Sequence, residues 1–198
     1  GKTLLENTII KLKENGFDDI IVNVHHFSKM VIDFLNNHDF GVKINISDES
    51  DRLLDTGGGI LKASTFLNGE EPFLIHNVDI ITDLNLLQLF KIHSKSNALA
   101  TLAVSKRESS RVFLFDIDMN LSGWRNNLTS KQIIPDSNRF PLEAFSFAGI
   151  HVISPDFFTL IKTKGAFSIV DAYLSLCTKN TIKGYDVSSN YVIDVGKP

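Results

Sequence analysis

The sequence contains one cysteine, Cys177. An intrachain disulfide is therefore excluded, and a reducing, cytoplasmic environment is expected. The apolar residues around Cys177 predict a buried and unreactive thiol. No apolar run approaches the roughly 18 residues that a membrane-spanning helix needs, so we expect no membrane partner.

Excess positive charge is also missing. The chain has 20 Lys and Arg against 23 Asp and Glu, a net charge of −3, and no block of basic residues. This composition argues against nucleic acid as the main partner. A phosphate-bearing ligand would have to be held by local cations, backbone N–H groups and a metal ion. We also find no internal repeat and no linker long enough to divide the chain, so residues 1–198 are expected to form a single domain.

Helix-like and strand-like segments alternate in the first half of the chain. A capping box, Thr3 to Glu6, predicts a helix that ends at Gly16. The other expected segments are a strand at 19–24, a helix at 28–35 with Ser28 as its cap, a strand at 42–47, a helix at 60–67, a strand at 73–76, a helix at 84–93 and a strand at 99–104. This alternation predicts a Rossmann-like α/β fold, with a mostly parallel mixed sheet flanked by helices.

The pattern changes after Val104. Residues 112–115 and 121–124, joined by a turn at 116–120, predict a small antiparallel hairpin inserted into the core. The remaining expected segments are a strand at 145–153, a helix from Ser154, a helix capped at 168–171, and strands at 182–187 and 191–193.

The first recognisable element is a helix. In a doubly wound sheet, by contrast, the chain begins with a central strand, and the loop after that strand binds phosphate. A sheet without that strand would leave buried backbone groups unpaired. We therefore expect the native polypeptide to extend upstream of Gly1, by an apolar strand and a glycine-rich phosphate loop.

Two aspartates follow apolar strand-like runs. Asp79 comes after the run 72–78, and Asp194 after 191–193. In open α/β sheets, ligands bind at the carboxyl ends of strands. Two carboxylates there would provide hard oxygen ligands for Mg²⁺, with water and phosphate completing its coordination. Each aspartate, taken alone, could equally be a helix cap or a turn residue.

Gly57, Gly58 and Gly59 permit a ligand to approach the backbone closely, and at a helix start their N–H groups can meet an anion or a base edge. A flexible turn is the alternative. Lys62 occupies a position that the dinucleotide fingerprint reserves for a small residue, which argues against that motif. His25 follows a strand and could contact a base or ribose, or lie in a solvated loop.

No Ser/His/Asp order or glutamate pair indicates hydrolysis. The absence of such a pattern is compatible with nucleotidyl transfer, in which the nucleophile is a phosphate oxygen that is already ionised. Catalysis then depends on positioning and on charge stabilisation.

Together these residues resemble the sugar-1-phosphate nucleotidyltransferases, and within that family the compact bacterial uridylyltransferases and guanylyltransferases that act on N-acetylmuramate 1-phosphate and mannose 1-phosphate. Six stretches carry the resemblance, in the family's order along the chain. They are 1–6, 23–26, 54–60, 77–79, 147–150 and 193–196.

The resemblance implies a Mg²⁺-dependent enzyme that converts an NTP and a sugar 1-phosphate into an NDP-sugar and pyrophosphate, in nucleotide-sugar synthesis for the bacterial cell envelope. It implies that Asp79 and Asp194 hold Mg²⁺. It also implies that Thr56, Gly57 and Gly58 line the nucleobase pocket, with His25 as a further nucleotide contact. The segment containing Ala148 and Gly149 would bind the sugar.

The chain departs from the family pattern in two places. The family's glycine-rich loop, with its arginine and downstream proline-lysine, would precede Gly1, and Lys197 stands where many relatives have threonine. Two alternatives stay open. One is a glycosyltransferase of similar fold, which would favour an Asp-x-Asp pair, whereas here Asn77 stands two positions before Asp79. The other is a non-catalytic nucleotide-sugar-binding module.

Overall fold

The computed structural model describes residues 1–67, 69–135 and 141–196. The chain falls into two compact units. The first unit contains Gly1–Gly69 and Phe158–Ala172, and the second contains Glu70–Phe157 and Tyr173–Pro198. Lys197, which departs from the family pattern, lies outside the described residues.

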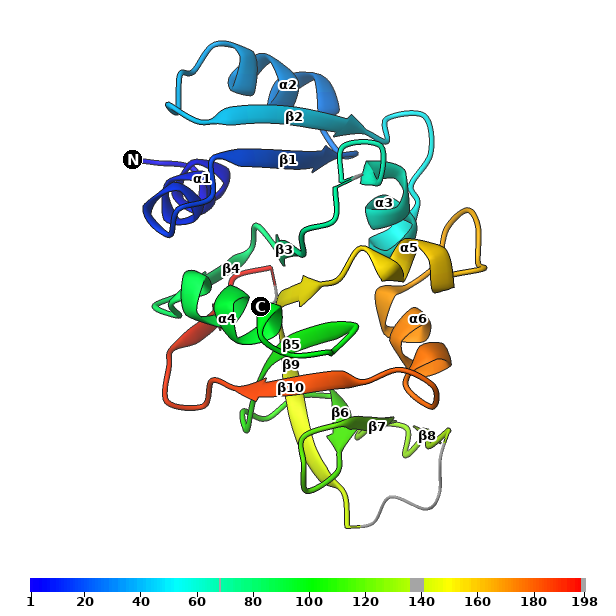
Figure 1. The fold of residues 1–198 in the computed structure, drawn as a ribbon. Coiled ribbons are helices and arrows are strands. Elements are labelled where there is room, and N and C mark those ends of the chain that lie inside the picture. Colours follow the sequence, from blue (N-terminus) through cyan, green and yellow to red (C-terminus); the bar gives the residue numbers. More distant parts are fainter. Residues whose placement is uncertain (68, 136–140, 197–198) are drawn as a thin grey trace. The chain divides into compact units, whose positions relative to one another are not determined.

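The first unit is built on a parallel pair of strands, β1 (Asp19–Val24) and β2 (Lys43–Asp48) (Figure 1). Because side chains alternate across a strand, Ile20 and its register partner Ile44 share one face of this pair. Helices α1 (Leu4–Glu14) and α2 (Ser28–Asn36) contribute Ile9 and Leu35 to the same apolar cluster.

The N-termini of these two helices differ. Thr3 caps α1 as predicted, because its Oγ1 accepts a hydrogen bond from Glu6 N at 3.1 Å. The prediction that Ser28 caps α2 is wrong. The cap residue is Phe27, whose left-handed backbone (φ 53°) turns the chain so that Ser28 becomes the first helical residue.

Helix α3 spans Asp55–Ala63, so it begins five residues before the predicted helix at 60–67. The glycines expected in a turn lie inside this helix, where all three are buried. The turn alternative is therefore wrong.

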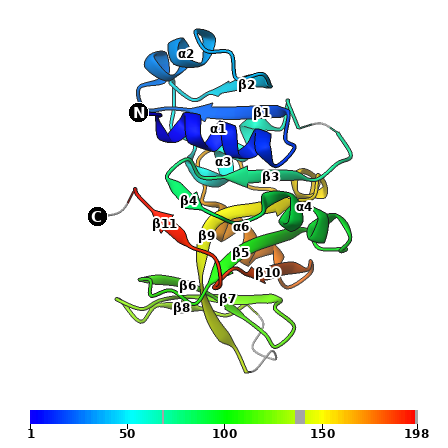
Figure 2. The same ribbon diagram turned by 90° about the vertical axis from the view of Figure 1, so that its left-hand side faces the viewer.

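The second unit contains a seven-stranded sheet centred on β9 (Glu143–Ile153) (Figure 2). The other strands are β3 (Phe73–His76), β5 (Ala100–Ser105), β6 (Arg111–Phe115), β7 (Leu121–Asn126), β8 (Gln132–Ile133) and β10 (Ile182–Asp186). The strand β5 pairs along one edge of β9, whereas β3 and β6 pair with different halves of its other edge. The length of β9 thus joins the core sheet to the β6–β7 hairpin, which confirms the predicted antiparallel insertion.

The mixed α/β prediction is confirmed, with one difference in the pairing. The strands β3, β5 and β10 point in the same direction, as the alternation predicted, but β9 runs antiparallel between β3 and β5. Within this sheet only β10 and β5 form a directly hydrogen-bonded parallel pair among the described strands. The direction of β9 relative to its neighbours could not be predicted, because the apolar pattern of a buried strand does not show whether its partners run parallel or antiparallel.

The core of the second unit includes apolar side chains from β5 and β9, with Leu102 and Ile150 fully buried. Cys177 is buried too, as predicted. The remaining elements are β4 (Ile80–Thr82), β11 (Val192–Asp194), α4 (Leu86–Ser94), α5 (Asp156–Leu160) and α6 (Ile169–Leu176). In the described part of the chain, no helix has both the length and the apolar character to span a membrane.

Candidate functional site

Asp79 and Asp194 come together in the second unit, on a short antiparallel pair formed by β4 and β11. Asp194 ends β11 and lies opposite Ile80 in the register. Asp79 directly precedes β4, and its carbonyl oxygen accepts a hydrogen bond from Val195 N at 2.9 Å. The two aspartates, 115 positions apart in sequence, are thus fixed beside each other by backbone pairing.

Gly196 shows how close the two carboxylates are. A Cβ atom added to Gly196 would collide with Asp79 Oδ2 and would lie 3.4 Å from Asp194 Oδ1. The Gly196 N–H also donates to Asp194 Oδ1 at 3.2 Å. The absence of a side chain at Gly196 therefore leaves room for both carboxylates around one point.

This donor set fits Mg²⁺. Magnesium ions are commonly held by one or two carboxylates, with water and substrate phosphates in the remaining positions. Both aspartates are partly exposed, so water and phosphate would have access to an ion held there. Within residues 1–67, 69–135 and 141–196, no three His, Cys, Asp or Glu side chains gather as a closed metal site would require.

Gly149 on β9 is held against the segment that carries Asp79. Its φ of +72° lies in the left-handed region that favours glycine. A Cβ there would lie 3.0 Å from Asn77 Nδ2 and 3.1 Å from Ile80 Cγ1, and Asn77 N donates to Gly149 O at 3.0 Å. The side chain of Ala148 is fully buried, so any ligand contact from this residue would come from its backbone.

In the first unit, His25 is anchored at the end of β1. Its Nδ1 lies 2.7 Å from the carbonyl oxygen of Glu49. Since a carbonyl only accepts, Nδ1 carries a proton, and in the neutral ring Nε2 is then an acceptor. His25 is partly buried, so its ring is fixed in orientation.

Glu49, which the sequence reasoning missed, organises this end of the β1–β2 pair. It is 1% exposed. Its backbone N–H donates to Val24 O at 2.7 Å, and its Oε2 accepts from Leu54 N at 3.0 Å, just before α3. An acid directly after an alternating strand was the available signal, but exposed acids are so common there that the signal is weak.

The predicted nucleobase residues lie in the first turns of α3. The Gly57 and Gly58 N–H groups both donate to Phe167 O, at 2.8 and 3.2 Å. Thr56 Oγ1 accepts from Ile169 N at 3.0 Å. These glycines permit close packing against segment 165–169, because a Cβ on Gly57 would overlap the Phe167 ring and one on Gly58 would overlap Gly165 O.

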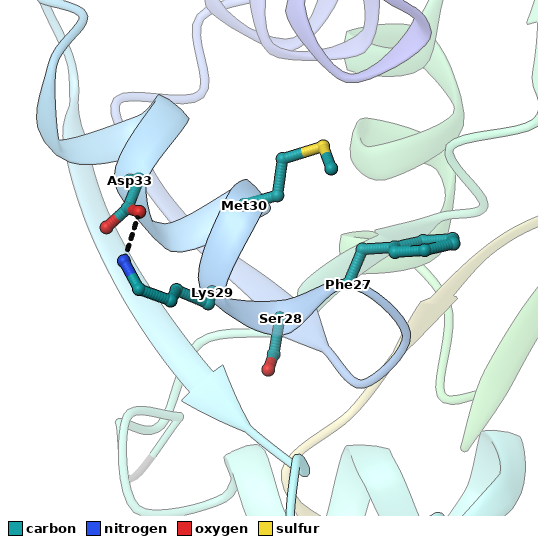
Figure 3. Close-up of a pocket in the computed structure, with 5 residues that line it drawn as sticks. All are labelled: Phe27, Ser28, Lys29, Met30 and Asp33. Carbon is teal, nitrogen blue, oxygen red and sulfur yellow. Dashed lines mark hydrogen bonds and ion pairs between the residues drawn. The ribbon is translucent and has the colours of Figure 1, made fainter.

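A shallow hollow of about 550 Å³ opens where α2 begins (Figure 3). It is lined by Phe27, Ser28, Lys29, Met30 and Asp33. Phe27 is 78% exposed and Met30 is 68% exposed, while Lys29 and Asp33 form an ion pair at 2.6 Å. None of the predicted site residues lines this hollow.

Two buried histidines of the second unit belong to the core. His93 Nδ1 lies 2.9 Å from Thr101 Oγ1, and its Nε2 lies 3.0 Å from Ser154 Oγ. His151 Nδ1 lies 2.6 Å from the Tyr173 hydroxyl. Burial lowers the pKa of His93 to about 4 and the pKa of His151 to about 3, because a charged imidazole would lose its hydration.

These pKa shifts predict acid destabilisation. Between about pH 6.5 and pH 4 the unfolded chain binds more protons than the folded one, so the free energy of unfolding falls as the pH is lowered. From pH 7 to pH 5 we expect a loss of roughly 2 kcal/mol for each histidine. Urea denaturation at several pH values measures this slope. The double variant His93→Gln/His151→Gln should flatten it, with the exposed His38→Gln as control, and an unchanged slope in the double variant would contradict the assignment.

The fold is an α/β arrangement of the nucleotide-binding type, with carboxylates at strand ends. A family model described as Nucleotidyl transferase matches residues 1–113, more than half of the chain. The chain therefore belongs to the nucleotidyl transferase family, which confirms the resemblance seen in the sequence.

Its relatives include a mannose-1-phosphate guanyltransferase of Yarrowia lipolytica, 24% identical over 100% of this chain and 53% of that protein. An N-acetylmuramate alpha-1-phosphate uridylyltransferase of Neisseria meningitidis is 25% identical over 99% of this chain and 80% of that protein. The chain thus spans about half the length of the guanyltransferase.

Among solved structures, HddC from Yersinia pseudotuberculosis, in complex with GMP-PN, matches with a TM-score of 0.75 at 18% identity, covering 100% of this chain and 82% of that one. The inositol-1-phosphate CTP transferase of T. maritima matches with a TM-score of 0.71 at 16% identity, covering 96% and 76%. These similarities show a shared fold.

Proposed function

We propose that the protein transfers a nucleotidyl group from an NTP to a sugar 1-phosphate, forming an NDP-sugar and pyrophosphate in the presence of Mg²⁺. The observation that carries this proposal is the convergence of Asp79 and Asp194 around Gly196. Membership of the nucleotidyl transferase family and the similarity to guanyltransferases and a uridylyltransferase support it.

In this reaction an oxygen of the sugar 1-phosphate forms a bond to the α-phosphorus of the NTP. The bond from that phosphorus to the oxygen bridging to the β-phosphate breaks, and pyrophosphate leaves with the electron pair. The attacking oxygen is already ionised, so no side chain has to remove a proton. The chain must instead position two polyanions and offset their repulsion.

Asp79 and Asp194 would hold Mg²⁺, which when bound supplies positive charge to the phosphates. The backbone pairing of β4 with β11 fixes both carboxylates before the substrates bind, so little reorganisation is needed. The backbone of Ala148 and Gly149 on β9 would contact the sugar, while the missing side chain of Gly149 accommodates Asn77 and Ile80.

We assign nucleotide binding to the first unit, through His25, Thr56, Gly57 and Gly58. In the neutral ring, His25 Nε2 would be an oriented acceptor, suited to a ribose hydroxyl or a base N–H. The Gly57 and Gly58 N–H groups already donate to Phe167 O, so their contribution would be a closely packed backbone surface rather than free donors.

The remaining parts of the proposal concern setting and partners. We propose a cytoplasmic role in supplying nucleotide sugars for the bacterial cell envelope, with no nucleic-acid or membrane partner. The similarity to the Neisseria uridylyltransferase, of which the chain covers 80%, supports this setting.

A panel of four NTPs against several hexose 1-phosphates tests the proposal. The full-length protein with Mg²⁺ is expected to release pyrophosphate with at least one pair, and to do so only when both substrates are present. Transfer of a sugar from an NDP-sugar to an acceptor, without pyrophosphate release, would point to the glycosyltransferase alternative. Binding of NDP-sugars without either turnover would point to the non-catalytic module.

A further inference from the structure

Arg107 is anchored beside the residues predicted to bind the sugar. It follows β5 by two residues, and its Nη2 donates to Phe147 O at 3.2 Å. Its own carbonyl oxygen accepts from Ser146 Oγ at 2.8 Å. Both its backbone and its guanidinium are therefore tied to β9, immediately before Ala148 and Gly149.

The charge of Arg107 is not balanced within the described part of the chain. No ion pair there includes it, whereas the adjacent Lys106 pairs with Glu143 at 2.6 Å. A guanidinium has five N–H donors, and the described residues accept from only one of its nitrogens, Nη2. Its Nε is buried without a hydrogen-bond partner.

Such a group is costly unless it finds an acceptor. A half-buried guanidinium has lost part of its hydration, and an unpaired donor in a low-dielectric setting pays that loss in full. Arginine matches the geometry of carboxylates and phosphates, which it binds through paired N–H groups. The arrangement therefore points to an anionic partner beyond the described residues.

The position of Phe147 suggests which part of the substrate carries that anion. Gly149 contacts Asn77 and Ile80, which flank Asp79. Phe147 lies two residues before Gly149 on β9. Arg107 thus contacts β9 just before the residue that lies against the Asp79 segment, on the strand that would face the sugar.

We propose that Arg107 binds an anionic group of the sugar substrate. This inference rests on the proposed function. The anion is either a carboxylate on the sugar ring or its substituent, which the contact of Arg107 with the strand predicted to bind the sugar favours, or the 1-phosphate itself. In the first case the protein selects acidic sugars.

Matched pairs of sugars distinguish a sugar carboxylate from the 1-phosphate as the group that Arg107 binds. Glucuronic acid 1-phosphate and glucose 1-phosphate differ by a carboxylate, as N-acetylmuramic acid 1-phosphate and N-acetylglucosamine 1-phosphate differ by a carboxylate-bearing ether. KM and kcat are measured for the full-length protein and for Arg107→Gln, Arg107→Lys and the control Lys106→Gln. Lys106 is exposed and already paired with Glu143, so its replacement removes the same charge from a neighbouring position.

If Arg107 binds a carboxylate, Arg107→Gln should raise KM about 10- to 100-fold for the acidic member of each pair and leave the neutral member within twofold. If it binds the 1-phosphate, KM rises similarly for both members. In either case kcat and the urea midpoint should change little, and Arg107→Lys should recover part of the loss. An unchanged KM for every sugar, or a loss matched by Lys106→Gln, would overturn the inference.

The failure of this inference can be told from the failure of the proposed function. Without nucleotidyl transfer, the unaltered protein would release no pyrophosphate with any sugar 1-phosphate. Calorimetric titration of the same sugar phosphates, with an NTP analogue resistant to cleavage, then still reports whether Arg107→Gln weakens binding. Equal affinity of Arg107→Gln and the unaltered protein for all four sugars would refute the role of Arg107 on its own.

Discussion

Replacing either Asp79 or Asp194 by asparagine is expected to lower the rate of pyrophosphate release by roughly 100- to 1000-fold. Asparagine keeps the size of the side chain but removes its charge. Both carboxylates lie beside the same point next to Gly196, so either variant removes an anionic ligand that the other carboxylate cannot replace. The rate is measured with saturating substrates at several Mg²⁺ concentrations.

Two comparisons make this result specific. Asp33→Asn removes an exposed carboxylate that pairs with Lys29 on α2, and its rate should equal that of the unaltered protein. The urea midpoints of Asp79→Asn and Asp194→Asn should lie close to the original value, because both carboxylates are partly exposed. Full activity of either variant would be incompatible with a two-carboxylate metal site.

The second large effect concerns stability. Gly58→Ala is expected to lower the free energy of unfolding by about 2–3 kcal/mol. The new Cβ would overlap the carbonyl oxygen of Gly165, a backbone atom that cannot rotate away, and would lie 3.0 Å from Leu54 Cβ. The overlap outweighs the gain of roughly 1 kcal/mol that alanine brings to a helix. Urea denaturation followed by circular dichroism gives the value.

Gly16→Ala provides the matched control. Gly16 has open space around it, but its φ of +86° is unfavourable for alanine, so we expect a cost near 1 kcal/mol. Gly58 has no positive φ, so its loss of stability would report the overlap with Gly165, whereas the loss at Gly16 would report backbone strain alone. A Gly58→Ala protein as stable as the original would show that segment 165–169 can move away from α3.

Local patterns were sufficient to predict much of the fold. The strand at Asp19–Val24 and the hairpin of β6 and β7 follow from apolar residues bounded by turn residues. The start of α3 was missed because a run of glycines normally indicates a turn. Here glycine is required by packing against segment 165–169, more than 100 positions away, and no local pattern reports such a contact.

In the candidate site, too, local patterns predict individual residues but not the contacts between distant parts of the chain. Asp79 and Asp194 could be predicted because each ends an apolar run, yet their proximity depends on the pairing of β4 with β11. Glu49 and Arg107 were missed because their roles depend on burial. One is a carboxylate that is 1% exposed, and the other is a guanidinium without an ion-pair partner in the described residues.

The most direct test of the two-carboxylate site is metal binding itself, measured with Mn²⁺ in place of Mg²⁺ by electron paramagnetic resonance in the presence of an NTP analogue. Mn²⁺ should bind more tightly to the complex of the unaltered full-length protein with the analogue than to the analogue alone. Asp79→Asn and Asp194→Asn should each lose most of that added affinity, whereas Asp33→Asn should keep it. Equal Mn²⁺ binding by the unaltered protein and both site variants would contradict the central claim.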